Sequence, residues 1–133
     1  MKGSDRAVID ALRAATSPDR VRVGSTELGL YRRDASNLDG DVGVVCFPLT
    51  TEEVQEVIRV CQRFGVPFVA RGHGSGLSGG ATPVQGGVVI GLARLNRVLD
   101  VDIPNRRVTV EPGVTNLEIS RQVASFGYYY APD

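Results

Sequence analysis

Lysine and histidine are almost absent from this chain of 133 residues, which contains one of each, Lys2 and His73. Because the only lysine stands at position 2, the chain has no Walker A phosphate loop, whose glycines lead into a lysine followed by serine or threonine. Two cysteines, Cys46 and Cys61, are too few for a disulfide framework, and both stand in apolar patterns. We therefore expect reduced, buried thiols in a cytoplasmic protein, and favour this over a disulfide between them.

The chain also lacks an excess of charge of either sign, since 15 basic and 15 acidic residues give a formal net charge of zero. This balance excludes the basic footprint of a nucleic-acid-binding protein. No apolar run approaches the length of a membrane span, and residues 1–17 lack the continuous apolar segment of a signal peptide. The composition is that of a globular domain with its own core, so neither a nucleic-acid partner nor a membrane span is expected.

A helix and an irregular segment are predicted to form a lead-in, residues 1–42. Apolar residues at helical spacing predict a helix over residues 5–15, which Ser4 or Asp5 can cap. The remainder of the lead-in is rich in glycine, aspartate and serine, and is predicted to be irregular apart from a short strand near residues 21–23.

Residues 43–133 are predicted to form part of a mixed α and β domain. A buried strand over 43–49 precedes a capping box, in which Thr50 and Glu53 cap the start of a helix reciprocally. Gly65 ends this helix, and a second strand follows at 67–70. Strand, helix and strand at this spacing predict a βαβ unit with parallel strands. The helix presents one apolar face, formed by Val54, Val57, Ile58, Cys61 and Phe64.

Further elements complete the predicted fold class, which is α+β with a small parallel βαβ sheet, flanking helices and a β-hairpin. A third strand is predicted over 87–92, a hairpin over 98–111 and a capped helix over 115–126. An aromatic extended segment begins at 128. Because it stops abruptly at residue 133, we expect the domain to be truncated there.

Alternation of apolar and polar residues predicts the register of the hairpin. Asp102 is expected opposite Arg107, and Val101 opposite Val108. In this arrangement Asp100 and Asp102 belong to a solvated face, which we favour over a metal-binding or acid–base pair. No metal site is expected.

The segment 67–83, PFVARGHGSGLSGGATP, is the strongest functional signal in the chain. It contains five glycines between positions 72 and 80, directly after a strand-like run. Glycine permits tight turns and close approach to a ligand, and successive free N–H groups form a nest for phosphate. We favour a phosphate-bearing cofactor over a connection that binds nothing, because each glycine adds unfolded-state entropy that folding must overcome. The expected donors are N–H groups of residues 72–76, with the hydroxyls of Ser75 and Ser78.

Residues 74–79 match the GxGxxG pattern of dinucleotide-binding Rossmann folds, and Asp100 follows at a suitable distance. That pattern must open a helix whose N-terminus holds the pyrophosphate. Here residues 80–87 contain three glycines and a proline, so no helix is expected and the Rossmann interpretation is rejected.

Several side chains near the loop leave alternatives open. Arg71 either contributes charge to a ligand or anchors the loop. For His73 an exposed polar side chain is favoured over a phosphate contact, an acid–base role or a covalent cofactor bond. Tyr31 and Asp34 favour a local turn over ligand contact, and the tyrosines at 128–130 either line an aromatic site or pack inward.

These motifs together resemble the N-terminal part of the FAD-binding domain of the vanillyl-alcohol oxidase, or PCMH-type, flavoprotein family, especially its glycolate oxidase and D-lactate dehydrogenase branch. Tyr31 and Asp34 also resemble a YxxD stretch that precedes the domain in that branch. The matching segments, within residues 44–133, are FPLTTEEVQEVIRVC, PFVARGHGSGLSGGATP, GGVVIGLARLNRVLDVD, VEPGVTNLEI and GYYYAPD.

The resemblance implies two α+β subdomains that sandwich FAD, with the loop 71–80 around the pyrophosphate. It implies that Pro48 and residues 112–114 lie near the adenine, and that Pro132 opens a second FAD loop. The residues expected to bind FAD are Pro48, Arg71, Gly72, His73, Gly74, Ser75, Gly76, Leu77, Ser78, Gly79, Pro112, Gly113, Val114, Pro132 and Asp133.

Some members of the family attach FAD through a histidine four residues after the arginine. This chain has Ser75 at that position and His73 two residues earlier, so the resemblance implies non-covalent FAD, with His73 as a loop residue that approaches the cofactor.

The parent protein is expected to be a flavin-dependent oxidoreductase of a small 2-hydroxy acid, with hydride transfer to the flavin. Its second FAD subdomain, substrate domain and acid–base residues are expected beyond residue 133, so no catalytic residue is assigned and the chain alone is expected to be inactive. The alternatives are a non-catalytic module of this fold, a MurB-like reductase, or the FAD part of a molybdenum hydroxylase. Unpaired sheet edges predict self-association.

Overall fold

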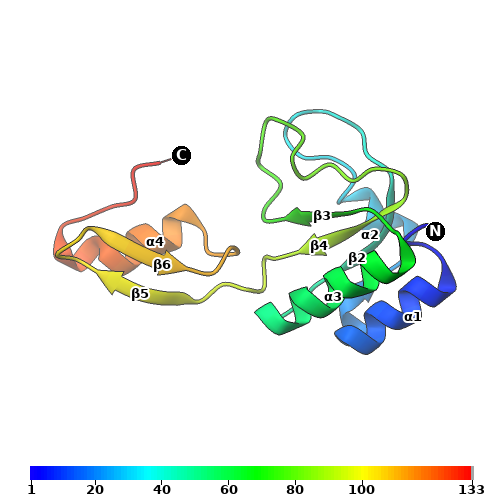
Figure 1. Ribbon diagram of the computed structural model, residues 1–133. Coiled ribbons are helices and arrows are strands. Elements are labelled where there is room, and N and C mark those ends of the chain that lie inside the picture. The colour runs from blue at the N-terminus through cyan, green and yellow to red at the C-terminus, as the bar shows by residue number, and fades with distance from the viewer. Residues whose placement is uncertain (133) are drawn as a thin grey trace. The chain divides into compact units, whose positions relative to one another are not determined.

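The chain folds into two compact units, residues 1–94 and a second unit that starts at Leu95, in a computed structural model that describes residues 1–132 (Figure 1). The fold class is the predicted one, with a small sheet and helices in the first unit and a hairpin in the second.

A four-stranded sheet forms the centre of the first unit. Its strands are β1 (Val21–Arg22), β2 (Val42–Cys46), β3 (Phe68–Arg71) and β4 (Gly87–Gly91), in the spatial order β1-β2-β4-β3. β4 lies between β2 and β3 and runs parallel to both, which confirms the predicted parallel βαβ unit. β1 adds an antiparallel edge beside β2.

Two amphipathic helices, α1 (Arg6–Ala15) and α3 (Thr51–Phe64), cover one face of this sheet (Figure 1). Short helical turns occur at Pro18–Arg20 and at α2 (Ser25–Gly29). The sequence did not predict α2, because its five residues are too short to show a helical period.

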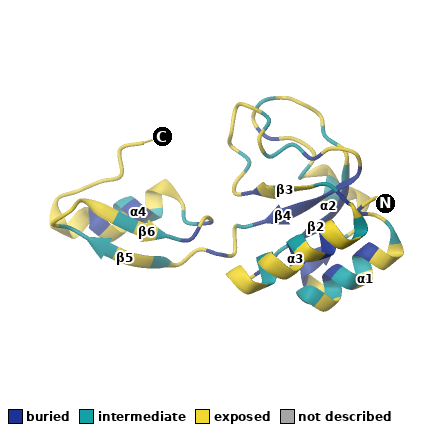
Figure 2. Ribbon diagram, in the orientation of Figure 1, coloured by how far each residue is buried: buried dark blue, intermediate teal, exposed yellow. Residues whose placement is uncertain are grey.

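The core lies between α1, α3 and the sheet, and β4 is buried along its whole length (Figure 2). Val45 and Val89 alternate with core residues along their strands and are also fully buried, so the opposite face of the sheet is covered as well. The buried cluster comprises Val8, Leu12, Val21, Val44, Cys46, Val57, Val60, Cys61, Val66, Val88 and Ile90.

The start of α3 is held by an ion pair between the buried Arg20 and the half-buried Glu53. Thr50 Oγ1 accepts a hydrogen bond from the Glu53 N–H at 3.2 Å, as the capping box predicted. The other half of the box was wrong, because the Glu53 carboxylate accepts from the Leu49 N–H at 2.7 Å and pairs with Arg20 at 2.5 and 2.8 Å. Hydrogen bonds from Arg20 chiefly, and from Leu49, lower the pKa of Glu53.

The second unit contains a hairpin, β5 (Val98–Asp102) and β6 (Arg107–Val110), followed by α4 (Asn116–Val123) and a turn of helix at Ala124–Phe126. The predicted register is confirmed, with Asp102 opposite Arg107 and Val101 opposite Val108. Within the described residues, no strand forms after position 127.

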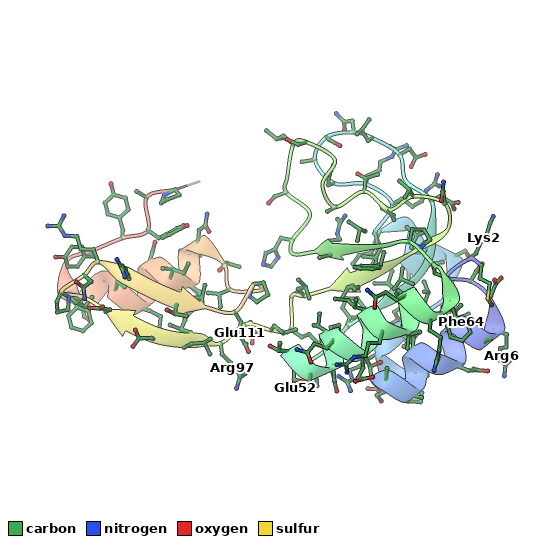
Figure 3. All side chains as sticks on the ribbon, viewed as in Figure 1. Lys2, Arg6, Glu52, Phe64, Arg97 and Glu111 are labelled. Atoms are coloured by element: carbon green, nitrogen blue, oxygen red, sulfur yellow. The ribbon has the colours of Figure 1, made fainter. Side chains whose placement is uncertain are left out.

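An ion pair closes the open end of the hairpin. The Arg97 guanidinium donates to Glu111 Oε1 at 2.7 and 3.0 Å, and the two side chains lie beside each other in Figure 3. The Arg97 backbone N–H donates to Glu111 Oε2 at 2.8 Å, and the Glu111 N–H donates to the Arg97 carbonyl at 2.9 Å. These bonds, the side-chain ones first, lower the pKa of Glu111 and fix the chain where it enters residues 112–114.

Replacing Glu53→Gln is expected to destabilise the chain by about 2–4 kcal/mol, because it leaves the buried Arg20 guanidinium without its counter-charge. The pKa of Glu53 is lower in the folded chain than in the unfolded chain. The stabilisation from the ion pair is therefore fully present when the pH is above the ordinary pKa of glutamate, and it is lost as the pH falls through the pKa of the folded chain. Chemical denaturation of the wild type and the variant should therefore show a difference in unfolding free energy that is largest at pH 7 and decreases below about pH 4.

Glu56→Gln is the matched control, since Glu56 lies on the same helix and pairs with Arg59 at an exposed position. A surface pair of this kind is worth about 0–1 kcal/mol. Equal losses in the two variants would contradict a structural role for the Arg20–Glu53 pair.

Candidate functional site

The glycine-rich loop connects the end of β3 to the start of β4 without any helix, as the rejection of a Rossmann site required. Most of its residues from Gly72 to Gly80 are exposed, and only Gly74 and Gly79 are half-buried. Among the described residues, the backbone N–H groups from His73 to Gly80 donate no hydrogen bond to protein atoms. The loop therefore presents a series of unbonded donors to its surroundings, which is the requirement for an anion-binding nest.

Arg71 begins the loop as a buried anchor. Its side chain is only 8% exposed, and its Nη1 donates to the Arg33 carbonyl at 2.8 Å. The guanidinium carbon also lies 5.5 Å from the centre of the Tyr31 ring, within cation–π range. These contacts are those that an anchor for the loop would make.

Gly74 packs directly against the Arg71 guanidinium. A Cβ at position 74 would lie 2.1 Å from Nη2 and 2.3 Å from Cζ, and Gly74 has a φ of +74°, which disfavours any other residue. Gly76 and Gly80 have no such constraint, since a Cβ at either position meets nothing within 4 Å. Only part of the loop's glycine content is therefore required by packing.

The far end of the loop rests on residues 34–38. A Cβ at Gly79, whose φ is also +74°, would lie 2.7 Å from Leu38 Cδ1. Asp34 accepts the Ser36 N–H at 2.9 Å in a local turn, and its second oxygen accepts the Ala81 N–H at 3.4 Å. These hydrogen bonds, those of Ser36 first, lower the pKa of Asp34, and the charge of Arg71 acts in the same direction.

A pocket of about 280 Å³ lies beside the first residues of the loop. Phe47 and Tyr31 meet edge to face in its wall, with ring centres 5.7 Å apart. Gly91 makes room for Phe47, because a Cβ there would approach the ring to 2.5 Å. The pocket is lined by Leu30, Tyr31, Phe47, Arg71, Gly72, His73, Gly91 and Ala93.

His73 is exposed at the mouth of this pocket, and the structure gives it no acid–base partner among the described residues. Pro48, by contrast, is fully buried, and its neighbour Phe47 faces the pocket instead. Sequence reasoning missed Phe47, although its place at the carboxyl end of a parallel strand was a usable signal. The assigned roles of His73 and Pro48 remain predictions.

The second group of predicted cofactor contacts lies in the second unit. Gly113 is buried and donates its N–H to the Leu95 carbonyl at 2.7 Å, whereas Pro112 is exposed and Val114 half-buried. Pro132 accepts a hydrogen bond from Asn116 Nδ2 at 3.0 Å, so it lies near the start of α4. Asp133 lies outside the described residues.

Other singled-out residues serve the structure of the second unit. Asp102 accepts from the backbone and side chain of Asn105 at 3.2 and 2.7 Å, as part of the hairpin turn. The tyrosines at 128–130 line a pocket of about 360 Å³ formed with the hairpin and α4, where Tyr129 remains 77% exposed.

Both cysteines are free and buried in the core of the first unit, as predicted. Burial raises the pKa of Cys46 to about 12 and that of Cys61 to about 11, which keeps both as thiols. In residues 1–132 no cluster of three potential metal ligands occurs, and no helix there is long and apolar enough to cross a membrane.

The chain is similar to known FAD-binding proteins. A family model described as an FAD binding domain matches residues 42–133. The glycolate oxidase subunit GlcD of Escherichia coli K12 is 48% identical over 90 residues, which are 68% of this chain and 18% of that protein. A probable mitochondrial D-lactate dehydrogenase of Danio rerio is 33% identical over 127 residues, 95% of this chain and 26% of that protein.

Among solved structures, 4-ethylphenol oxidase from Gulosibacter chungangensis is similar, with a TM-score of 0.78 and 30% identity over 90% of this chain and 24% of its own. The chain thus spans only about a fifth to a quarter of the length of these proteins.

The contact between Gly74 and Arg71 generates a direct test of the loop's geometry. Gly74→Ala is expected to lower the free energy of unfolding by about 1–3 kcal/mol, because alanine disfavours a positive φ and its Cβ displaces the guanidinium. Chemical denaturation would measure the loss. Gly76→Ala is the control, with no neighbour within 4 Å, and a loss there as large as at Gly74 would contradict the assignment.

Proposed function

This chain belongs to the PCMH-type FAD-binding domain family, and we propose that its glycine loop, residues 71–80, holds the pyrophosphate of FAD. The observation that supports the proposal is the run of unbonded backbone N–H groups from His73 to Gly80, in a loop whose residues are mostly exposed. A pyrophosphate carries negative charge and many acceptor oxygens, so it can accept several of these donors at once.

The loop's residues fit this ligand in three ways. The glycines at 76 and 80 leave open space where side chains would otherwise stand between phosphate and backbone. Ser75 and Ser78 are exposed and can add hydroxyl donors. Arg71 holds the start of the loop and lends positive charge without itself being exposed.

We propose that FAD is bound without a covalent bond. The position four residues after the arginine is Ser75, and His73 lies beside the pocket that Phe47 and Tyr31 line. In this arrangement the single imidazole approaches the cofactor as a polar neighbour. We propose that the rest of FAD is contacted by Pro48, residues 112–114, Pro132 and Asp133.

We further propose that the protein takes part in the oxidation of a small 2-hydroxy acid of the glycolate or D-lactate type, because the relatives named above are a glycolate oxidase subunit and a probable D-lactate dehydrogenase. Bound FAD would supply the chemistry by accepting hydride from the alcohol carbon. We assign no catalytic residue to the present chain, whose contribution is to bind and orient the cofactor. The two free, buried thiols support a cytoplasmic location.

Titration with FAD, followed by absorbance and flavin fluorescence, tests the proposal. The wild-type chain is expected to bind saturably and to release all flavin on acid precipitation. Gly76→Asp should weaken binding about tenfold or more, because it places a carboxylate among the proposed phosphate donors. Gly76→Asn has nearly the same shape without the charge and should bind much more tightly than the aspartate variant.

Equal affinities of the aspartate and asparagine variants would contradict a phosphate at this loop. Flavin that stays with acid-precipitated protein would contradict non-covalent binding.

Self-association is a further expected property, since the second unit exposes large apolar side chains on a small hairpin and helix. Leu99, Leu117 and Phe126 are each more than half exposed. Sedimentation velocity over a range of concentrations should show species larger than the monomer. A single monomeric boundary at the highest concentration would contradict this expectation.

A further inference from the structure

We propose that Asp34 is a positioning residue for the glycine loop, and that residues 31–41 form the base on which the loop is held for phosphate binding. This inference rests on the proposed function, because it assigns a role in FAD affinity to a residue that does not itself touch the ligand. In Figure 1 the two segments lie side by side on the first unit, the cyan segment next to the green loop.

Contacts between the two segments lie at the two ends of the loop and just beyond it. At the near end, the Arg33 carbonyl accepts from Arg71, and Tyr31 lies under its guanidinium. At the far end, the Asp41 N–H donates to the Pro83 carbonyl at 3.0 Å. The base is itself closed by the Gly40 N–H, which donates to the Arg32 carbonyl at 2.9 Å.

Asp34 lies at the middle of this base and is only 8% exposed. One carboxylate oxygen accepts the Ser36 N–H and so shapes the base, while the other accepts the Ala81 N–H directly after the loop's last glycine. A single buried carboxylate therefore joins the two segments. Without it, the protein offers the Ala81 N–H no other acceptor among the described residues.

The positions of the loop's free donors depend on this connection. The N–H groups of residues 73–80 donate no hydrogen bond, and the one backbone bond printed for this stretch is accepted by the Gly79 carbonyl from the Thr82 N–H at 3.1 Å. The loop is therefore fixed chiefly at its ends, by Arg71 at one and Asp34 at the other. Free N–H groups bind an anion well only when they are already oriented, since ordering a loose loop costs affinity. Removing the Asp34 carboxylate should therefore lower the affinity for FAD while leaving the sheet of the first unit stable.

Two variants of Asp34 and one control distinguish an effect on FAD binding from an effect on the stability of the fold. Asp34→Ala removes both acceptors, whereas Asp34→Asn retains one carbonyl oxygen and should give an intermediate result. Asp39→Asn is the control, because Asp39 carries the same charge on the same segment but pairs with the exposed Arg32 and Arg33. Asp34→Ala should raise the FAD dissociation constant about tenfold or more, and Asp39→Asn less than about twofold.

Hydrogen exchange on the full chain provides a readout that needs no FAD. Asp34→Ala should speed exchange at the Ala81 amide about tenfold or more while leaving the amides of β2 and β4 protected. Faster exchange throughout the sheet would overturn the inference, because Asp34 would then serve general stability. An unchanged Ala81 amide would overturn it as well.

The two experiments also keep this inference distinct from the proposed function. If the wild-type chain binds no FAD, the proposed function fails for this chain, and hydrogen exchange still decides whether Asp34 positions the loop. If the wild type binds FAD and Asp34→Ala binds as tightly as Asp39→Asn, the proposed function stands and the positioning role of Asp34 is overturned.

Discussion

Burial of the Arg71 guanidinium is the constraint on which the candidate site depends. A guanidinium that leaves water needs hydrogen bonds and favourable electrostatic contacts in exchange, and here the Arg33 carbonyl and the Tyr31 ring provide them. Because the arginine folds inward, the backbone directly after it must pass close over the side chain. That passage leaves no room for a Cβ at Gly74, so one buried charge determines both the partner segment and the local residue type.

The same constraint explains why the loop combines fixed and free parts. Its ends are held by Arg71 and Asp34, while the residues between them make few contacts with the protein. Backbone donors that are held in place but not used internally can meet an anion at small additional cost. The glycines at 74 and 79 serve the packing of the loop, and those at 76 and 80 leave its outer side open.

Local patterns in the sequence were enough to predict most of the fold. Alternation of apolar and polar residues predicted the pairing of Asp102 with Arg107, and Thr50 with Glu53 predicted the start of α3. The partner of the Glu53 carboxylate was not predictable, because Arg20 stands 33 positions away and no local signal connects them. In the same way the glycine loop was evident from composition, but the base beneath it was not. The contact of Arg71 with Arg33 joins residues that are 38 positions apart in the chain, and the contact of Ala81 with Asp34 joins residues that are 47 positions apart.

The position of His73 has a spectroscopic consequence. As the only imidazole in the sequence, it should give a single set of ring-proton signals in a proton NMR spectrum, free of overlap with other histidines. It stands within the loop and lines the same pocket as the aromatic rings of Phe47 and Tyr31. The chain thus carries an intrinsic reporter at its candidate site, whose resonance reflects what occupies that pocket without any label attached.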